Sequence, residues 1–335
     1  MEVRRSERPM RAGSLTAPAT WTPVAVPAPD PAALPDGEVL VRVLAGGICG
    51  SDLPAFRGTG PLPPGAAAVP GTPLHEIVGE VLASRDPQLR PGIRVVGWAA
   101  RFDGLAEFVV TPGAGLHEYD PALDPAAAVL LQPLACVLDA LEYVPDVRGA
   151  RVAVIGQGPT GLLFSHVLKA RGAAHVTGVD LTDRSDLAAR YGVDEPVRGN
   201  ATAWAAGLGA DRPAVVVEAV GHQVGTLVAA VEAVAVGGHV HAFGIPDDPI
   251  YPFPMALFLR KCVTLSAAHT LERRGALAAA GAYLAEHPEL AEHYVTHVFD
   301  LGHAQRAFEV ATRPLPGRVK VVIDVAGAAR APGPE

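Results

Sequence analysis

The chain has 335 residues, of which 49% are hydrophobic, and this length and composition favour two globular domains over one. The formal net charge of −8, without a basic cluster beyond a short one at residues 4–8, argues against nucleic acid and anionic membranes as partners, so we expect small-molecule ligands. No run of about 18 uninterrupted apolar residues is present, and the three cysteines are widely spaced, so we expect a cytoplasmic protein without a disulfide framework.

The first third of the chain predicts an irregular antiparallel β domain. Short β-branched runs alternate there with proline and glycine turns, after a charged segment at residues 1–13 that we expect to be frayed. The runs that predict strands are GEVLVRVL (37–44), EIVGEVLA (76–83), IRVVGWA (93–99) and AEFVVTP (106–112).

From Arg151 onward, strands alternate with helices, a pattern that predicts a parallel sheet with crossover helices. The predicted elements are a strand at 151–156, a helix at 161–172, a strand at 175–180 and a helix at 183–192, and the alternation continues through 214–221, 224–238, 239–244 and 262–267. A helical stretch at 271–294 and a strand at 318–325 precede a Pro/Gly/Ala tail that we expect to be disordered.

A dinucleotide site is predicted at VAVIGQGPTGLL, where Gly156, Gly158 and Gly161 stand between a strand and a helix. Gly156 allows the tight turn, Gly158 lets the backbone approach a pyrophosphate, and Gly161 lets the helix pack closely on the strand. Asp180 ends the next strand, where a carboxylate meets ribose hydroxyls and repels a 2′-phosphate, so NAD is favoured over NADP. Arg184 lies just downstream, and we expect its side chain to be solvated.

A metal site is predicted in the β domain. Cys49 lies in the glycine-rich stretch GGICGSD, and His75 and Glu76 stand together before a strand. Thiolate, imidazole and carboxylate are ligand types of a catalytic zinc ion that keeps a position open for water or substrate. Neighbouring residues on a strand point to opposite faces, so only a turn would let His75 and Glu76 both reach one ion.

The motifs GGICGSD, HEIVGEV, LLQPLACVL, VAVIGQGPTGLL and VEAVGH, in this order, resemble the zinc-dependent medium-chain dehydrogenase/reductase superfamily, most of all its sorbitol/polyol dehydrogenase branch. The resemblance runs from about Met10 to Val325. It implies an α/β fold in which a Rossmann doubly wound parallel sheet (129–269) is inserted in a GroES-like β-rich catalytic domain (1–128 and 270–335). The active site would lie in the cleft between the two domains.

The resemblance also implies roles for single residues. Cys49, His75 and Glu76 match zinc ligands, Ser51 matches the hydroxyl that takes the alcohol proton, and Asp52 matches the carboxylate that orients the ligand histidine. His222 falls near the expected nicotinamide end of the cofactor. The residues expected at the cofactor are Gly156, Gly158, Pro159, Thr160, Gly161, Asp180, Val220, Gly221, Gly244 and Lys320, although a solvated Lys320 fits the sequence equally well.

Several positions depart from the family's pattern. The segment GWAARFDGLAEF (97–108) stands where relatives carry four cysteines, so no second, structural zinc is expected. Gln132 replaces a glutamate, Leu74 a glycine, and Pro54 the relay histidine. Gln132 is a poor zinc ligand, but we count it among the catalytic residues because it can hydrogen-bond to a water or a substrate hydroxyl. Cys136 lies close by in sequence, and both a metal ligand and a buried helix residue remain open for it.

Together these patterns predict a zinc-dependent oxidoreductase that transfers a hydride between a secondary alcohol and NAD, with a polyol, cyclitol or aminocyclitol as substrate. The resemblance implies a homodimer or homotetramer whose sheet extends through the strand at 262–267. Two alternatives stay open. A relative that binds dinucleotide but has lost zinc chemistry would account for the three substitutions, and a zinc-free enone reductase using NADPH is disfavoured by Asp180 and by the intact ligand set.

Overall fold

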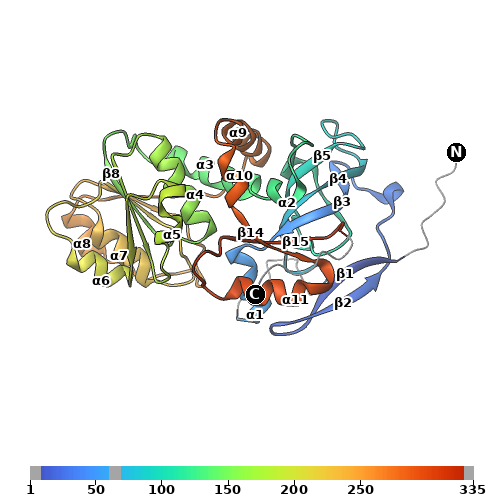
Figure 1. The fold of residues 1–335 in the computed structure, drawn as a ribbon, viewed down its shortest axis with the longest axis horizontal. Coiled ribbons are helices and arrows are strands. Elements are labelled where there is room, and N and C mark those ends of the chain that lie inside the picture. Colours follow the sequence, from blue (N-terminus) through green and yellow to red (C-terminus); the bar gives the residue numbers. More distant parts are fainter. Residues whose placement is uncertain (1–8, 60–68, 328–335) are drawn as a thin grey trace. The chain divides into compact units, whose positions relative to one another are not determined.

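A computed structural model describes residues 9–59 and 69–327, which form two compact units (Figure 1). Of the described residues, unit 1 comprises 9–59, 69–135, 272–313 and 318–327, and unit 2 comprises 136–271 and 314–317. The first strand begins at Met10, so the expectation of a frayed segment up to residue 13 is wrong for its last four residues, which pair with the following strand. The expected disordered tail falls mostly on residues 328–335, outside the described residues.

Unit 1 is built on a seven-stranded, largely antiparallel sheet and a separate two-stranded hairpin. The order in the sheet is β14-β15-β3-β4-β5-β7, with β6 paired to β3. The hairpin consists of β1 (Met10–Ala17) and β2 (Thr20–Val26), and the sheet consists of β3 (Glu38–Gly47), β4 (Glu76–Ser84), β5 (Arg94–Trp98), β6 (Phe108–Pro112), β7 (Leu116–Glu118), β14 (Val295–Asp300) and β15 (Lys320–Asp324). The four β-branched runs form β3 to β6, so the antiparallel β domain is confirmed.

The core of unit 1 lies between this sheet and the helix α11 (Ala304–Thr312), which places Ala304, Ala307 and Phe308 among the strand residues. A short helix, α1 (Leu53–Arg57), packs on α11 through a stacked ring pair, Phe56 and Phe308, whose centroids are 4.8 Å apart. Both rings are buried. Because α1 directly follows residues 49–52, this contact anchors the predicted metal loop to the core.

The C-terminal helical stretch of unit 1 is broken in two. Pro288 cannot continue a helix, so the predicted helix at 271–294 divides into α9 (Arg273–Glu286) and α10 (Glu289–His293). Arg274 fastens α9 to the β domain, because its guanidinium donates to Asp86 Oδ2 at 2.7 Å and to the carbonyl of Gly113 at 2.6 Å.

Unit 2 contains a six-stranded, entirely parallel sheet in the order β10-β9-β8-β11-β12-β13, as the alternation of strands and helices predicts. The strands are β8 (Arg151–Ile155), β9 (His175–Asp180), β10 (Glu195–Arg198), β11 (Val215–Glu218), β12 (His239–Ala242) and β13 (Thr264–Ala267). Figure 1 shows helices on both sides of this sheet, namely α4 (Pro159–Ala170), α5 (Ser185–Ala188), α6 (Ala201–Gly207), α7 (Gly225–Ala233) and α8 (Met255–Arg260). The Rossmann-type sheet is therefore confirmed.

Within the described residues, one stretch is long and apolar enough to cross a membrane. It runs from Pro125 to Tyr143 and contains α2 (Pro125–Ala128) and α3 (Leu131–Ala140). Because 61% of it is buried inside the structure, it has the surroundings of a core helix in a globular protein.

Candidate functional site

The predicted metal ligands gather where three strands of unit 1 meet. Gly47, the last residue of β3, pairs with Glu76 of β4 on one side and with Val322 of β15 on the other. Directly after β3, Cys49 precedes a single 3₁₀ turn, Gly50–Asp52, which turns the chain back. The sheet register therefore brings together segments that are far apart in sequence.

Cys49, His75 and Glu76 each place one ligand atom within 4.8 Å of the other two. His75 lies just before β4, so the alternation of strand faces begins only at Glu76, and both side chains reach the same point. Two ligands of a tetrahedral zinc ion, bound at 2.0–2.3 Å, stand about 3.5 Å apart, which this cluster allows. The thiol, imidazole and carboxylate groups fit a zinc ion chemically and spatially.

Asp52 holds both the cysteine loop and the histidine. Its Oδ2 accepts a hydrogen bond from the Cys49 N–H at 2.8 Å, and its Oδ1 accepts one from His75 Nδ1 at 2.8 Å. Burial disfavours the charged His75 ring, but Asp52, helped by the Cys49 thiol, overcomes this and raises the pKa of His75 well above its ordinary value. Zinc binding has to displace that proton, while Asp52 keeps the other ring nitrogen turned towards the metal.

A buried lysine completes the cluster. Lys320, the first residue of β15, places its Nζ 2.7 Å from Glu76 Oε1 and 2.6 Å from Oε2, and the two side chains are only 2% and 1% exposed. The alternative of a solvated Lys320 is therefore wrong, because its ammonium is buried and paired with Glu76, while its expected contact with the cofactor stays a prediction. A Cβ at Gly47 would overlap the Glu76 carboxylate and lie 2.8 Å from Lys320 Cε, so only glycine fits there.

The other residues discussed for the metal site have different surroundings. Ser51 is half-buried in the turn before α1, and Pro54 stands in the first turn of that helix, where a missing N–H costs no intrahelical bond. Leu74 is fully buried in the core, and Gln132 is 3% exposed in the first turn of α3. Cys136 is half-buried, belongs to unit 2, and is not part of the ligand group.

The glycine turn of unit 2 has the geometry of a phosphate cradle. Gly156 has φ +90°, and a Cβ at Gly161 would overlap the carbonyl of Gly156, so the helix and the strand pack closely there. A Cβ at Gly158 would meet no described atom within 4 Å, which leaves open space beside the N-terminus of α4. Pro159 and Thr160 begin this helix. The turn fits a dinucleotide pyrophosphate.

Asp180 is bound to the same turn. Its Oδ2 accepts a hydrogen bond from the Gln157 N–H and its Oδ1 from the Thr182 N–H, each at 2.7 Å. Each carboxylate oxygen has a second lone pair for a ribose hydroxyl. Arg184 is buried, at 6% exposure, and its guanidinium donates to the carbonyl of Leu315 at 3.1 Å. The prediction of a solvated Arg184 is therefore wrong.

The turns that follow β11 and β12 lie against each other. Val220 and Gly221 follow β11, and their N–H groups donate to Glu218 Oε1 at 3.0 and 3.1 Å. A Cβ at Gly244, after β12, would overlap the backbone of Gly221, so the two turns touch. Glu218 was not among the predicted residues, although a carboxylate at the end of a predicted strand was the available signal.

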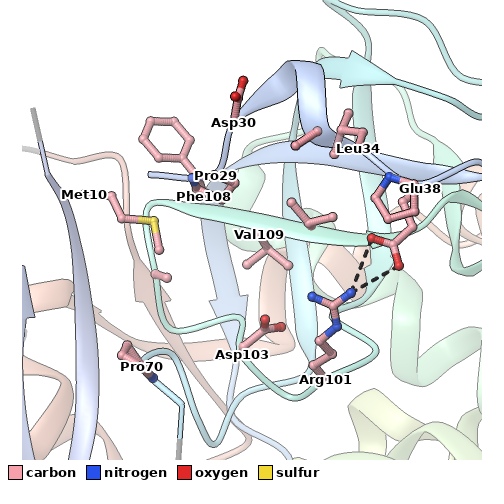
Figure 2. A pocket seen from close by; sticks show the side chains of 14 residues that line it. Met10, Pro29, Asp30, Leu34, Glu38, Pro70, Arg101, Asp103, Phe108 and Val109 are labelled. Atoms are coloured by element: carbon pink, nitrogen blue, oxygen red, sulfur yellow. Dashed lines mark hydrogen bonds and ion pairs between the residues drawn. The ribbon is translucent and has the colours of Figure 1, made fainter. Parts of the chain in front are cut away.

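Unit 1 also contains a pocket of about 320 Å³ that includes none of the predicted site residues. Figure 2 shows the Arg101 guanidinium donating to both carboxylate oxygens of Glu38, at 3.2 and 3.4 Å, above Asp103. Burial raises the pKa of Asp103. The only cation drawn there is already paired, so the pocket offers no free charge to an anionic ligand.

Comparisons with known proteins agree with this geometry. Residues 35–119 match the family model of the alcohol dehydrogenase GroES-like domain, and residues 159–280 match that of the zinc-binding dehydrogenases. D-altritol 5-dehydrogenase of Agrobacterium fabrum is 31% identical over 277 residues, which cover 72% of this chain and 79% of the relative. The chain belongs to the zinc-dependent medium-chain dehydrogenase/reductase superfamily.

Two further relatives support the assignment. A probable zinc-binding alcohol dehydrogenase of Mycobacterium tuberculosis is 30% identical over 280 residues, covering 71% of this chain and 69% of the relative. The structure of an alcohol dehydrogenase from Thermus sp. ATN1 has a TM-score of 0.80 and 29% identity, covering 94% of this chain and 100% of the other. The protein is thus an oxidoreductase of the alcohol dehydrogenase type, with zinc and a nicotinamide dinucleotide as cofactors and a small alcohol or ketone as substrate.

The buried ion pair generates a stability prediction for this superfamily member. Lys320→Met would leave the Glu76 carboxylate buried without its cation, and removing one partner of a buried pair costs about 3–5 kcal/mol. We expect a loss of that size in the free energy of urea unfolding of the metal-free protein. Lys169→Met, which removes a surface partner of Asp194, should cost about 1 kcal/mol or less. Equal losses in both variants would contradict this account.

Proposed function

We propose that the protein oxidises a secondary alcohol group of a polyol, cyclitol or aminocyclitol with NAD. The observation that carries the proposal is the convergence of Cys49, His75 and Glu76 on one point in unit 1, with Asp52 behind the histidine. The similarity to an altritol dehydrogenase supports the polyol class. In this proposal unit 1 is the catalytic domain and unit 2 the dinucleotide-binding domain.

When bound, the two cofactors would supply the chemistry that side chains lack, Lewis-acid polarisation of the substrate oxygen by zinc and acceptance of the hydride by NAD. Cys49, His75 and Glu76 would hold the metal. The Ser51 hydroxyl, two residues after Cys49, accepts the proton that leaves the substrate hydroxyl. Gln132 would hydrogen-bond to a water or a substrate hydroxyl through its amide. Pro54 has no titratable group, so the proton passes from this loop to solvent or to another base.

The dinucleotide would bind along the carboxyl edge of the sheet in unit 2. The backbone from Gly156 to Gly161 and the N-terminus of α4 would hold the pyrophosphate, and Asp180 would accept from the adenosine ribose. Val220, Gly221 and Gly244 line the turns beyond the point between β8 and β11 where the strand order reverses. This arrangement favours NAD, because Asp180 repels a 2′-phosphate and the buried Arg184 guanidinium is bonded to the carbonyl of Leu315.

A cytoplasmic homo-oligomer completes the proposal. β13 is the edge strand of the sheet in unit 2, so its outer backbone groups have no partner strand in the described chain. Met255, Leu259 and Leu265 of α8 and β13 are exposed apolar side chains. A second copy adding its own β13 would continue the sheet and cover them.

The first test is metal content. The purified parent protein should contain about one zinc per chain, and Cys49→Ser should lose the metal together with alcohol oxidation. Cys262→Ser, which changes an exposed cysteine, should keep both. Parent protein that contains no zinc and reduces enones with NADPH would favour the zinc-free reductase, and parent protein with neither zinc nor activity would favour a relative that has lost the chemistry.

Cofactor preference tests Asp180. Asp180→Asn keeps an oxygen that can accept from one backbone N–H but removes the charge, so discrimination against NADP should fall about tenfold or more. The ratio of kcat/KM for NAD to that for NADP measures it. Asp194→Asn, a carboxylate at the opposite edge of the sheet, is the matched control and should leave the ratio unchanged. A parent that prefers NADP would refute the assignment.

The proton path tests Ser51. Ser51→Ala should lower kcat for oxidation by about 10² to 10⁴, whereas Ser51→Thr, which keeps the hydroxyl, should retain most activity. The first turn of α1 tolerates an added N–H, so Pro54→His should fold and raise the oxidation rate near neutral pH. If Ser51→Ala oxidises alcohols as fast as the parent over the whole pH range, the proton does not leave through this loop.

A further inference from the structure

The loops that follow β11 and β12 are fastened together at His222. The His222 N–H donates to the carbonyl of Ile245 at 2.8 Å, and its Nδ1 lies 2.6 Å from Asp247 Oδ1. The Asp247 N–H in turn donates to the Tyr251 hydroxyl at 2.9 Å. All of these residues belong to unit 2, at the carboxyl edge of its sheet.

This link does not by itself explain why residue 222 is a histidine. His222 has φ +55° and follows Gly221 at φ +65°, so a side chain stands in a left-handed conformation that costs about 1 kcal/mol or more. The His222 and Asp247 side chains are 32% and 51% exposed, and an ion pair this exposed stabilises the folded protein by about 1 kcal/mol or less. Glycine would make the same backbone bond to Ile245 without strain. A strained backbone conformation that no structural interaction offsets indicates that the side chain at this position has a functional role.

The place of His222 indicates what that function is. β11 lies beside β8 where the strand order of the sheet reverses, and a dinucleotide crosses such a point with its phosphates. The Val220 side chain packs on the glycine turn, since a Cβ at Gly156 would lie 2.6 Å from Val220 Cγ2. His222 is two residues further along the same loop.

We propose that His222 is a dinucleotide-binding residue whose Nε2–H donates a hydrogen bond to a pyrophosphate oxygen, and that Asp247 is a positioning residue that fixes the ring through Nδ1. The hydrogen bond from Nδ1–H to the Asp247 carboxylate sets the ring's orientation, and the ring that donates to the pyrophosphate is the one that carries a proton on each nitrogen. The pyrophosphate is then held from two sides, by the N-terminus of α4 and by His222. The inference rests on the proposed dinucleotide site.

The experiment measures binding of NADH and of ADP-ribose to the full-length, zinc-containing protein. His222→Asn is the variant, because asparagine tolerates the left-handed backbone and can still bond to Asp247. Its shorter side chain has no counterpart of the imidazole Nε2, so it loses the group that donates to the phosphate. Both ligands contain the pyrophosphate, so both Kd values should rise about tenfold. KM for NAD should rise while kcat at saturating NAD stays unchanged.

The control is His175→Asn. His175 also pairs with a carboxylate, Glu195 Oε2 at 3.1 Å, but at the start of β9, on the opposite edge of the sheet, so its loss should change neither Kd. Asp247→Asn should weaken both ligands less than His222→Asn does, without lowering the melting temperature, because the amide still bonds to the ring.

Three results would overturn the inference. Unchanged Kd values in His222→Asn, with or without a lower melting temperature, would leave the histidine a purely structural link. Weaker binding of NADH alone would move the contact to the nicotinamide half. If the parent itself binds neither NADH nor ADP-ribose, the proposed function fails together with the inference, a result distinct from selective loss in the variant.

Discussion

The buried ion pair between Glu76 and Lys320 is the constraint around which unit 1 is arranged. It joins the start of β4 to the start of β15, residues that are 244 positions apart, across the end of β3. A buried carboxylate and a buried ammonium are each costly alone, so the sheet register that brings them together excludes neighbouring registers. The ion pair also requires glycine at position 47, in the strand between β4 and β15. The residues of the metal cluster and the register of the sheet therefore depend on each other.

Carboxylates also hold the other loops in place, there by accepting hydrogen bonds from backbone N–H groups. Asp52, Asp180 and Glu218 each accept backbone N–H groups of a turn at the end of a strand. An N–H···carboxylate bond is charge-assisted and stronger than a neutral one, so it holds a loop that has few apolar contacts of its own. Asp52 also accepts a hydrogen bond from His75, and Asp180 keeps a second lone pair on each oxygen. In the proposed function each of these carboxylates therefore shapes a loop and also acts in the site, Asp52 on the metal-binding histidine and Asp180 on the ribose.

Local patterns in the sequence predict the parts of this structure that depend on local rules. The parallel sheet follows from alternating strands and helices, and the turn at Gly156 follows from its glycines. Such patterns do not predict contacts between segments that are far apart in the sequence. Nothing local shows that Lys320 is buried until the pairing of β15 with β3 places it on Glu76, and Arg184 is predicted as a surface residue until the structure shows its bond to the carbonyl of Leu315. His222 shows its left-handed backbone only in the structure.

One departure from the family's pattern and the buried lysine act on the charge of the metal cluster in the same direction. The glutamate that the family's pattern has at position 132 would add a negative charge to the site that the resemblance implies, and Gln132 does not. Of the two charges that remain, on the Cys49 thiolate and the Glu76 carboxylate, Lys320 neutralises that of Glu76. In the proposed function, a divalent ion in such a site would keep more of its positive charge for the substrate oxygen, and a more strongly polarised alcohol would give up its proton more readily. With Pro54 in place of a relay histidine, a more acidic substrate hydroxyl lessens the need for a strong base at the end of the proton path.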